Sequence, residues 1–343
     1  MAPLARGDRR APAPVRLRRP RRTGRLRRTV LAALVTAAVA VPVAGAARPA
    51  EVPAPAPTGL ARLTSAEPTA LEGELAARYA AGREALRAAE RTADAYGAHR
   101  RAASLRAMAA PGRRILSFDG RDGGRSVEVV GDLARAERIA VLVPGADTGL
   151  DNYDRFRAGA AALQDTLRRE SRARTAVVAW LGYRTPATGS AASVTPGRAA
   201  QAAPALRSFV EELRAVRPAA RITLLGHSYG SVVCALAAAR LPVAAVVLYG
   251  SPGTGFDTAA DLHASAAVWA GRASGDWVGE VPHVRLPLLP GTELGFGTDP
   301  VDPGFGARRF AAGDGGHSDY LARGSVSLRN LARLVGGQEP DRA

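Results

Sequence analysis

The 343-residue sequence contains a single cysteine, Cys234, and no lysine. One cysteine excludes an internal disulfide framework, and no Cys/His cluster has the spacing of zinc ligands, so we predict no metal site. The absence of lysine beside heavy use of alanine and arginine is typical of a GC-rich genome, and we attach no function to it. Hydrophobic residues make up 47% of the chain, which excludes a disordered protein.

Acidic residues are also scarce, with 31 against 47 arginines and a formal net charge of +16. The excess is concentrated in residues 1–28, where eleven arginines and one acid give +10 and leave +6 for the other 315 residues. Such a basic chain resembles a nucleic-acid binder. However, the basic block directly precedes the apolar run 30–41 and the small residues Ala44-Gly45-Ala46. This order is typical of a secretory signal, so we predict no nucleic-acid partner.

We predict that residues 1–46 are a signal peptide, cleaved after Ala46, and that the protein is secreted. The run Arg27-Arg28-Thr29-Val30-Leu31 resembles a twin-arginine export motif, although Leu26 replaces the usual Ser or Thr. The alternative is a membrane anchor, because residues 29–47 carry no charge and could just span a bilayer. We favour cleavage because Pro42 falls where a signal ends; contact with a membrane is expected only through an uncleaved N-terminal segment.

The exported part begins with two segments of distinct composition. Residues 47–66 are rich in proline and alanine, which predicts a semi-rigid tether. Residues 67–110 have apolar residues at helical spacing, and Gly82 and Gly97 are points at which this helical segment could divide. Its narrow apolar stripe predicts that one side packs on the following domain, with a separate binding role as the alternative. Residues 337–343 are interpreted as a tail.

Residues 111–336 alternate short apolar runs with amphipathic segments. The runs at 114–118 and 126–130 flank a turn-rich stretch and predict a hairpin. The further predicted strands are 139–143, 175–180, 222–225, 243–249, 266–269 and 309–312; the predicted helices are 151–169, 199–216, 231–240 and 327–335. Strands that alternate with helices require a parallel sheet covered on both faces, so we predict a doubly wound α/β domain.

The motif Gly226-His227-Ser228-Tyr229-Gly230 matches G-x-S-x-G and lies between a predicted buried strand and a predicted helix. At such a turn the serine adopts a strained backbone and its hydroxyl projects above the sheet, while the two glycines allow the close crossing. The amide of Tyr229 then opens a helix and can donate to a developing oxyanion. We therefore predict that Ser228 is a nucleophile.

A serine hydroxyl needs a base, and the chain has five histidines. In this kind of fold the base follows the last strand, which selects His317 in a glycine-rich loop. His227 lies inside the elbow and is interpreted as a packing residue; His99, His263 and His283 are interpreted as ordinary structural or surface residues.

The acid of such a site is expected after the second strand that follows the nucleophile, which selects Asp276 in Gly275-Asp276-Trp277. Its role would be to orient His317 and to stabilise the imidazolium. Two other acids, Asp257 and Asp261, precede that strand. Three more come after it in looser context, namely Glu280, Asp299 and Asp302. The resulting chain order of serine, aspartate and histidine is the one that this fold requires.

A second oxyanion donor is expected in the loop after strand 139–143. Pro144 has no N–H, so Gly145 or Ala146 must donate, and we prefer Ala146. Trp180 and Tyr183 end a strand at the same edge and are candidate walls of a substrate pocket, with core packing as the equal alternative. Residues 285–306 could line an acyl pocket or form a surface loop.

Several short motifs together resemble the actinobacterial α/β-hydrolase family long catalogued as a domain of unknown function. They are Val143-Pro-Gly145, Trp180-Leu-Gly-Tyr183, Gly226-His-Ser-Tyr-Gly230, Tyr249-Gly-Ser-Pro-Gly253, Gly275-Asp276 and Gly316-His-Ser-Asp-Tyr320. The resemblance covers residues 110–336 and implies the α/β-hydrolase fold with a triad of Ser228, Asp276 and His317. It implies no particular substrate.

The sequence thus predicts an exported serine hydrolase that cleaves an ester, thioester or amide of a small or acylated substrate through an acyl-enzyme. Neither a metal nor an organic cofactor is implied, and the oligomeric state is left open. Alternatives with the same residues are an acyltransferase or a peptidase. From a different class, the chain could be a non-catalytic surface-binding module on the same fold.

Overall fold

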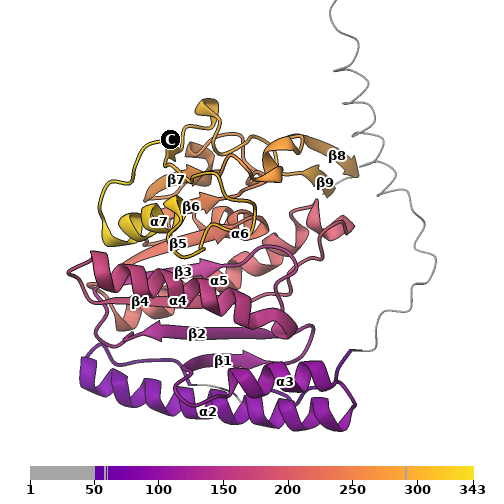
Figure 1. Cartoon of the computed structure of the whole chain (residues 1–343), viewed down its shortest axis with the longest axis vertical. Helices are drawn as coiled ribbons and strands as arrows, with labels where there is room; N and C mark the ends of the chain where they lie inside the picture. Colours follow the sequence, from indigo (N-terminus) through magenta and orange to yellow (C-terminus); the bar gives the residue numbers. More distant parts are fainter. Residues whose placement is uncertain (1–50, 58, 60, 290–291) are drawn as a thin grey trace, which may run out of the picture. The chain divides into compact units, whose positions relative to one another are not determined.

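An eight-stranded sheet forms the centre of the computed structural model, which describes residues 51–57, 59, 61–289 and 292–343 (Figure 1). The strand order is β1-β2-β4-β3-β5-β6-β7-β10. Five pairs in the series from β4 to β10 are parallel, whereas β1 and β2 form an antiparallel hairpin at one edge. The strands are β1 (Ile115–Asp119), β2 (Arg125–Gly131), β3 (Arg138–Val143), β4 (Thr175–Leu181), β5 (Arg221–His227), β6 (Ala245–Tyr249), β7 (Ala267–Gly271) and β10 (Arg308–Arg309). The predicted signal peptide lies outside the described residues.

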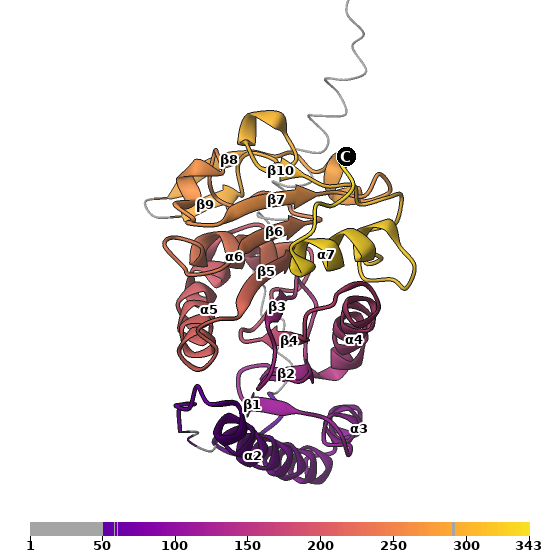
Figure 2. The same ribbon diagram turned by 90° about the vertical axis from the view of Figure 1, so that its left-hand side faces the viewer.

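Helices cover both faces of this sheet, as Figure 2 shows. One face carries α5 (Gly197–Val216) and α6 (Tyr229–Ala237), and the other carries α4 (Tyr153–Glu170) and α7 (Val326–Gly336). The strands between them are almost wholly apolar, because a parallel strand is buried on both faces. The prediction of a mostly parallel, doubly wound α/β fold is confirmed. None of the helices in the described part is long and apolar enough to span a membrane.

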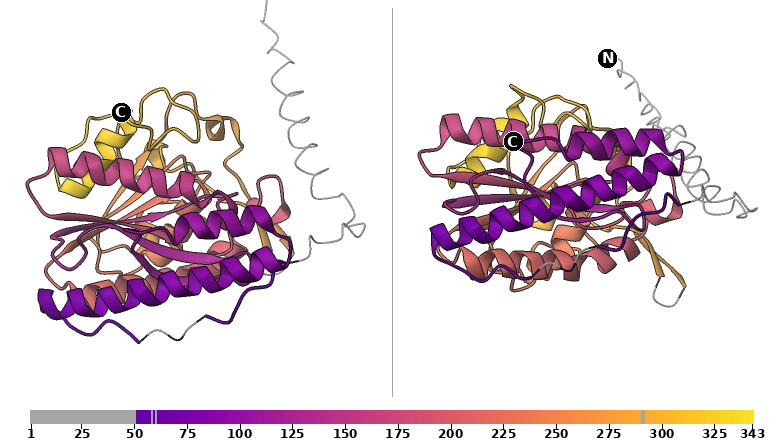
Figure 3. Two further views of the ribbon diagram at one scale, coloured as in Figure 1. Left: turned by 60° about the horizontal axis from the view of Figure 1, so that its bottom comes forward. Right: turned by 90° about the horizontal axis from the view of Figure 1, so that it is seen from below.

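The N-terminal helical segment divides at one of its two glycines. Helix α2 (Pro68–Ala95) runs unbroken through Gly82, and α3 (His99–Met108) follows a turn in which Gly97 has φ +82° (Figure 3). Gly82 lies on the buried side of α2, where an added Cβ would come 2.5 Å from the Ile115 carbonyl oxygen. This glycine therefore permits close packing of α2 on β1, in line with the predicted packing role of the segment.

The proline-rich stretch before α2 packs on the domain rather than hanging free as a tether. Val52 contacts the core under α2 and α3, and Leu63 is buried. The Leu63 amide donates to Glu212 Oε1 at 2.9 Å, which fastens this stretch to α5. Prolines disfavour helix and ladder formation, but they do not prevent apolar side chains from being buried.

Other departures from the predicted elements are local. Helix α6 ends at Ala237 instead of the predicted Arg240, and the chain turns at Arg240, which has φ +55°. The last strand, β10, has only two residues instead of the four predicted. Residues 285–306 contain an unpredicted hairpin of β8 (Arg285–Leu289) and β9 (Thr292–Gly295), which form a separate two-stranded sheet. Five short 3-10 helices, η1 (Leu150–Asn152), η2 (Ala191–Ser193), η3 (Ala260–Leu262), η4 (Trp277–Glu280) and η5 (Pro303–Phe305), complete the described part.

Candidate active site

Ser228 lies at the sharp turn between β5 and α6. Its backbone has φ 51° and ψ −126°, a strained conformation for a residue with a side chain. The turn brings α6 against the neighbouring strand, because a Cβ added to Gly230 would come 2.4 Å from the Val143 carbonyl oxygen. Likewise, a Cβ added to Gly226 would come 2.7 Å from Ser231 Cα. Only glycine fits at both positions, and the fit holds the serine in its strained geometry.

The side chains of Ser228, His317 and Asp276 meet at the carboxyl ends of the parallel strands. His317 Nε2 lies 2.9 Å from Ser228 Oγ, and His317 Nδ1 lies 2.9 and 3.0 Å from the two carboxylate oxygens of Asp276. Asp276 follows β7, and His317 comes from the loop between β10 and α7. Three elements far apart in the chain therefore place a hydroxyl, an imidazole and a carboxylate in series.

The Asp276 carboxylate is buried but well supplied with hydrogen-bond donors. Burial by itself raises its pKa, but hydrogen bonds from His317, Tyr320 and the Val278 amide outweigh that effect and hold the pKa below its ordinary value. The Val278 N–H donates to Oδ1 at 2.9 Å as Asp276 caps η4. Asp276 is therefore ionised at neutral pH and can stabilise a positive imidazolium.

Tyr320 also contacts the series of Ser228, His317 and Asp276, and its role was not predicted from the sequence. Its hydroxyl donates to Asp276 Oδ2 at 2.6 Å and accepts from the Ala273 N–H at 3.1 Å. Burial, together with the neighbouring carboxylate, raises the pKa of Tyr320 far above its ordinary value, so the hydroxyl keeps its proton and donates it. The sequence signal was a tyrosine three residues after the histidine, but a loop conformation is needed to aim it at the acid.

His227 supports the loop of the candidate base. Its Nε2 lies 2.8 Å from the His317 carbonyl oxygen, to which a neutral imidazole can donate, and the two rings are 4.7 Å apart. Burial, with a smaller contribution from His317, lowers the pKa of His227 to about 4. A neutral His227 binds the His317 backbone and adds no positive charge beside the ring of His317, which must itself accept a proton.

One predicted oxyanion donor directly follows the serine in the chain, and the other lies in the loop after β3. Tyr229 is the first residue of α6, and Ala146 follows Gly145 in the loop after β3. This loop touches the serine, because a Cβ added to Gly145 would come 2.7 Å from Ser228 Cβ. Among the backbone hydrogen bonds of the described residues, none uses the N–H of Tyr229 or Ala146. Both amides are thus free to donate to a ligand.

Trp180 and Tyr183, the candidate pocket walls, occupy the core. They are only 2% and 4% exposed and stack on each other with ring centroids 6.2 Å apart. The Tyr183 hydroxyl donates to the Pro144 carbonyl at 2.7 Å, and its ring stacks on Tyr229. This position matches the core-packing alternative, and it lets both residues support the loop that carries Gly145 and Ala146.

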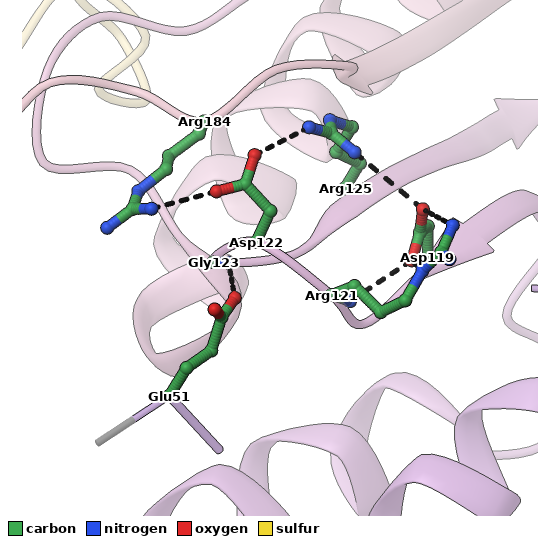
Figure 4. Close-up of polar contacts among 7 residues, drawn as sticks. All are labelled: Glu51, Asp119, Arg121, Asp122, Gly123, Arg125 and Arg184. Atoms are coloured by element: carbon green, nitrogen blue, oxygen red, sulfur yellow. Dashed lines mark hydrogen bonds and ion pairs between the residues drawn. The ribbon is translucent and has the colours of Figure 1, made fainter. Parts of the chain in front are cut away.

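A charged network lies at the turn between β1 and β2 (Figure 4). Because the start of β2 pairs with the end of β4, this turn lies where the parallel strands end, as Ser228 does. Asp122 accepts from Arg125 and Arg184, each at 2.8 Å, and Asp119 accepts from Arg121 at 3.0 Å. Each of these arginines has an acidic partner. The full network, which also ties the N-terminal stretch to the turn, consists of Glu51, Asp119, Arg121, Asp122, Gly123, Arg125 and Arg184.

Comparison with known proteins points to one family. A family model described as Alpha/beta hydrolase matches residues 119–286. The uncharacterized protein Rv2079 of Mycobacterium tuberculosis (strain ATCC 25618 / H37Rv) is 32% identical over 261 residues, which cover 65% of this chain and 38% of that protein. The uncharacterized protein Rv0963c of the same strain is 35% identical over 179 residues, covering 47% of this chain and 67% of that protein. The chain thus spans less than two fifths of the length of Rv2079.

Solved structures with some similarity include two bacterial enzymes. XC6422 from Xanthomonas campestris, described as an α/β serine hydrolase without lid, has 19% identity and a TM-score of 0.39, with 66% of this chain and 94% of that one covered. The esterase LipW from Mycobacterium marinum has 15% identity and a TM-score of 0.37, with 73% and 88% covered.

Proposed function

This chain belongs to the α/β-hydrolase family, and from that premise we propose that it is an exported serine hydrolase that cleaves a carboxylic ester. The observation that carries the proposal is the unbroken series of short contacts from Ser228 Oγ through the His317 ring to the Asp276 carboxylate, each 2.9 or 3.0 Å long. A serine hydroxyl with this support is activated for attack on a carbonyl carbon.

The reaction would proceed through an acyl-enzyme. Ser228 Oγ bonds to the carbonyl carbon while its proton passes to His317 Nε2, and Asp276 stabilises the imidazolium. The amides of Tyr229 and Ala146 would hold the oxyanion of the tetrahedral intermediate. His317 then gives the proton to the leaving oxygen as its bond to carbon breaks. Water attacks the acyl-enzyme with His317 as base, and the acid product departs as the serine recovers its proton.

Hydrolysis of an ester, with water as the acyl acceptor, and export of the protein are both parts of this proposal. An alcohol in place of water would make the protein an acyltransferase, and an amide substrate would make it a peptidase or amidase. No step of the proposed reaction requires a cofactor. Export rests on the predicted signal in residues 1–46, and an uncleaved residue 29–47 segment would instead anchor the enzyme with the domain outside.

The proposal is tested by hydrolysis of a graded series of acyl esters beside matching amides, with the form that lacks residues 1–46. We expect esters to be cleaved, and we expect Ser228→Ala to lower turnover by roughly 10⁴–10⁶ without unfolding the domain. Thermal unfolding of the variant supplies the control for folding. Near-wild-type hydrolysis by Ser228→Ala would contradict the proposal and would favour a non-catalytic role for the site.

A further inference from the structure

Four of the five exposed large apolar side chains of the described part fall within residues 277–286, a segment that begins beside the candidate site. They are Trp277, Val281, Val284 and Leu286, at 53%, 36%, 45% and 51% exposure, with Tyr96 at 50% as the one outside the segment. The segment starts at the residue after Asp276. Exposed apolar side chains scattered singly need no explanation, but a run of them next to reactive groups marks a surface that binds apolar ligands.

The backbone at Trp277 is anchored next to the candidate base. Asp276 caps η4 by accepting from the Val278 amide, and Val278 itself is buried, so the residues on both sides of Trp277 are anchored. The indole centroid lies 4.9 Å from that of His317, with the rings tilted by 53°. His227 also packs on His317 but is much less exposed, so the indole is the aromatic surface beside His317 that a ligand in solvent can reach.

Two arginines at this segment have partners of opposite sign, whereas Glu280, which lies within it, is exposed. Arg272 bonds to Asp299, and Arg285 bonds to Asp257 at 3.0 Å. Paired charges offer little net attraction to an ionic ligand. The segment exposes four large apolar side chains together with the carboxylate of Glu280.

We propose that Trp277 binds the apolar alkyl group of the leaving alcohol, and that the substrates are esters of apolar alcohols. The inference rests on the proposed function, because His317 must reach the leaving oxygen in order to protonate it. The alcohol portion of the ester then lies beside the His317 ring. The carbonyl oxygen of the ester, in contrast, lies toward the amides of Tyr229 and Ala146. An indole in contact with His317 is therefore placed against the alcohol side of the substrate.

The test is the dependence of kcat/KM on alcohol length, measured with acetate esters from ethyl to octyl. Complete burial of one methylene group raises binding affinity by about fourfold. The indole covers only one side of the alkyl chain, so each added methylene should raise kcat/KM of the wild type by about twofold. Trp277→Ala should flatten this dependence, and Trp277→Phe should retain most of it. Tyr96→Ala is the matched control, because it removes an equally exposed aromatic residue at the end of α2 and should change nothing.

A second series varies the acyl chain and keeps the leaving group constant, with 4-nitrophenyl esters from acetate to octanoate. Trp277→Ala should lower kcat/KM by one common factor here and leave the dependence on acyl length as it is. A loss of acyl-length dependence would overturn the assignment to the alcohol side. A uniform loss across the alkyl acetates would also overturn it, because Trp277 would then act only by supporting His317.

A binding measurement separates this inference from the proposed function. Trp180 and Trp269 are buried, so Trp277 is the tryptophan that acrylamide quenches most readily. We expect 1-octanol to protect this fluorescence in the wild type and in Ser228→Ala, where catalysis plays no part. Unprotected fluorescence with active ester hydrolysis would overturn the inference alone. Protected fluorescence without hydrolysis of any ester would overturn the proposed function.

Discussion

Replacing His227 by glutamine is predicted to make the stability of the protein less sensitive to acid. Burial lowers the pKa of His227 in the folded protein to about 4. In the unfolded chain the pKa of a histidine is about 6.5. As the pH falls below the pKa of His227 in the unfolded chain, the unfolded chain binds a proton at this residue and the folded chain does not. The free energy of unfolding therefore falls through the window from about pH 6.5 down to about 4.

The size of the effect follows from these two values. Between pH 7.5 and pH 5 the titration of His227 alone should remove about 2 kcal/mol from the free energy of unfolding. Glutamine does not titrate, and its amide can still donate to the His317 carbonyl oxygen, which His227 Nε2 approaches to 2.8 Å. The variant can be less stable than the wild type at pH 7.5, but its loss on acidification should be smaller by about 2 kcal/mol.

The assay is urea unfolding of both proteins at pH 7.5, 6 and 5, followed by circular dichroism. Titrating groups remote from position 227 contribute equally to both proteins and cancel in the difference. His99→Gln is the matched control, because it replaces an exposed histidine whose surface pair with Asp94 contributes little to stability. Equal acid sensitivity of the wild type and His227→Gln would refute the argument that His227 is neutral in the fold.

Tyr320→Phe removes one hydrogen bond from the Asp276 carboxylate, and should lower stability by about 1–3 kcal/mol and kcat roughly 10- to 100-fold; unfolding and kinetics together check this, and unchanged kcat would show a purely structural tyrosine. Gly145→Ala places a Cβ 2.7 Å from Ser228 Cβ, so ester hydrolysis should fall at least about tenfold; full activity would contradict the close contact.

The strand and helix order of the α/β domain could be predicted because its elements carry strong local patterns. The apolar run at 222–225 is typical of a buried strand, and the run after Gly230 is typical of a covering helix. The hairpin of β8 and β9 was missed because Pro287 and the short, mixed sequence weaken any alternating pattern. The packing of residues 51–63 was also missed, because composition predicts stiffness but not which side chains find a partner.

The candidate site was predictable to the extent that chain order reflects topology. Ser228, Asp276 and His317 each follow a strand at the same edge of the sheet, so their order along the chain selected them. Tyr320 and Trp277 were outside that reasoning, because their positions depend on loop and 3-10 geometry around the acid. Such contacts arise from tertiary packing and have no periodicity along the sequence.

The measurement that tests the central claim most directly is covalent labelling by a fluorophosphonate probe, followed by peptide mapping. An activated serine attacks the phosphorus, whereas ordinary serines do not react. We predict a single modification on the peptide that contains Ser228, its absence in Ser228→Ala, and much slower labelling in His317→Gln. Labelling of the wild type that persists in Ser228→Ala, or a wild type that the probe leaves unmodified, would contradict the account.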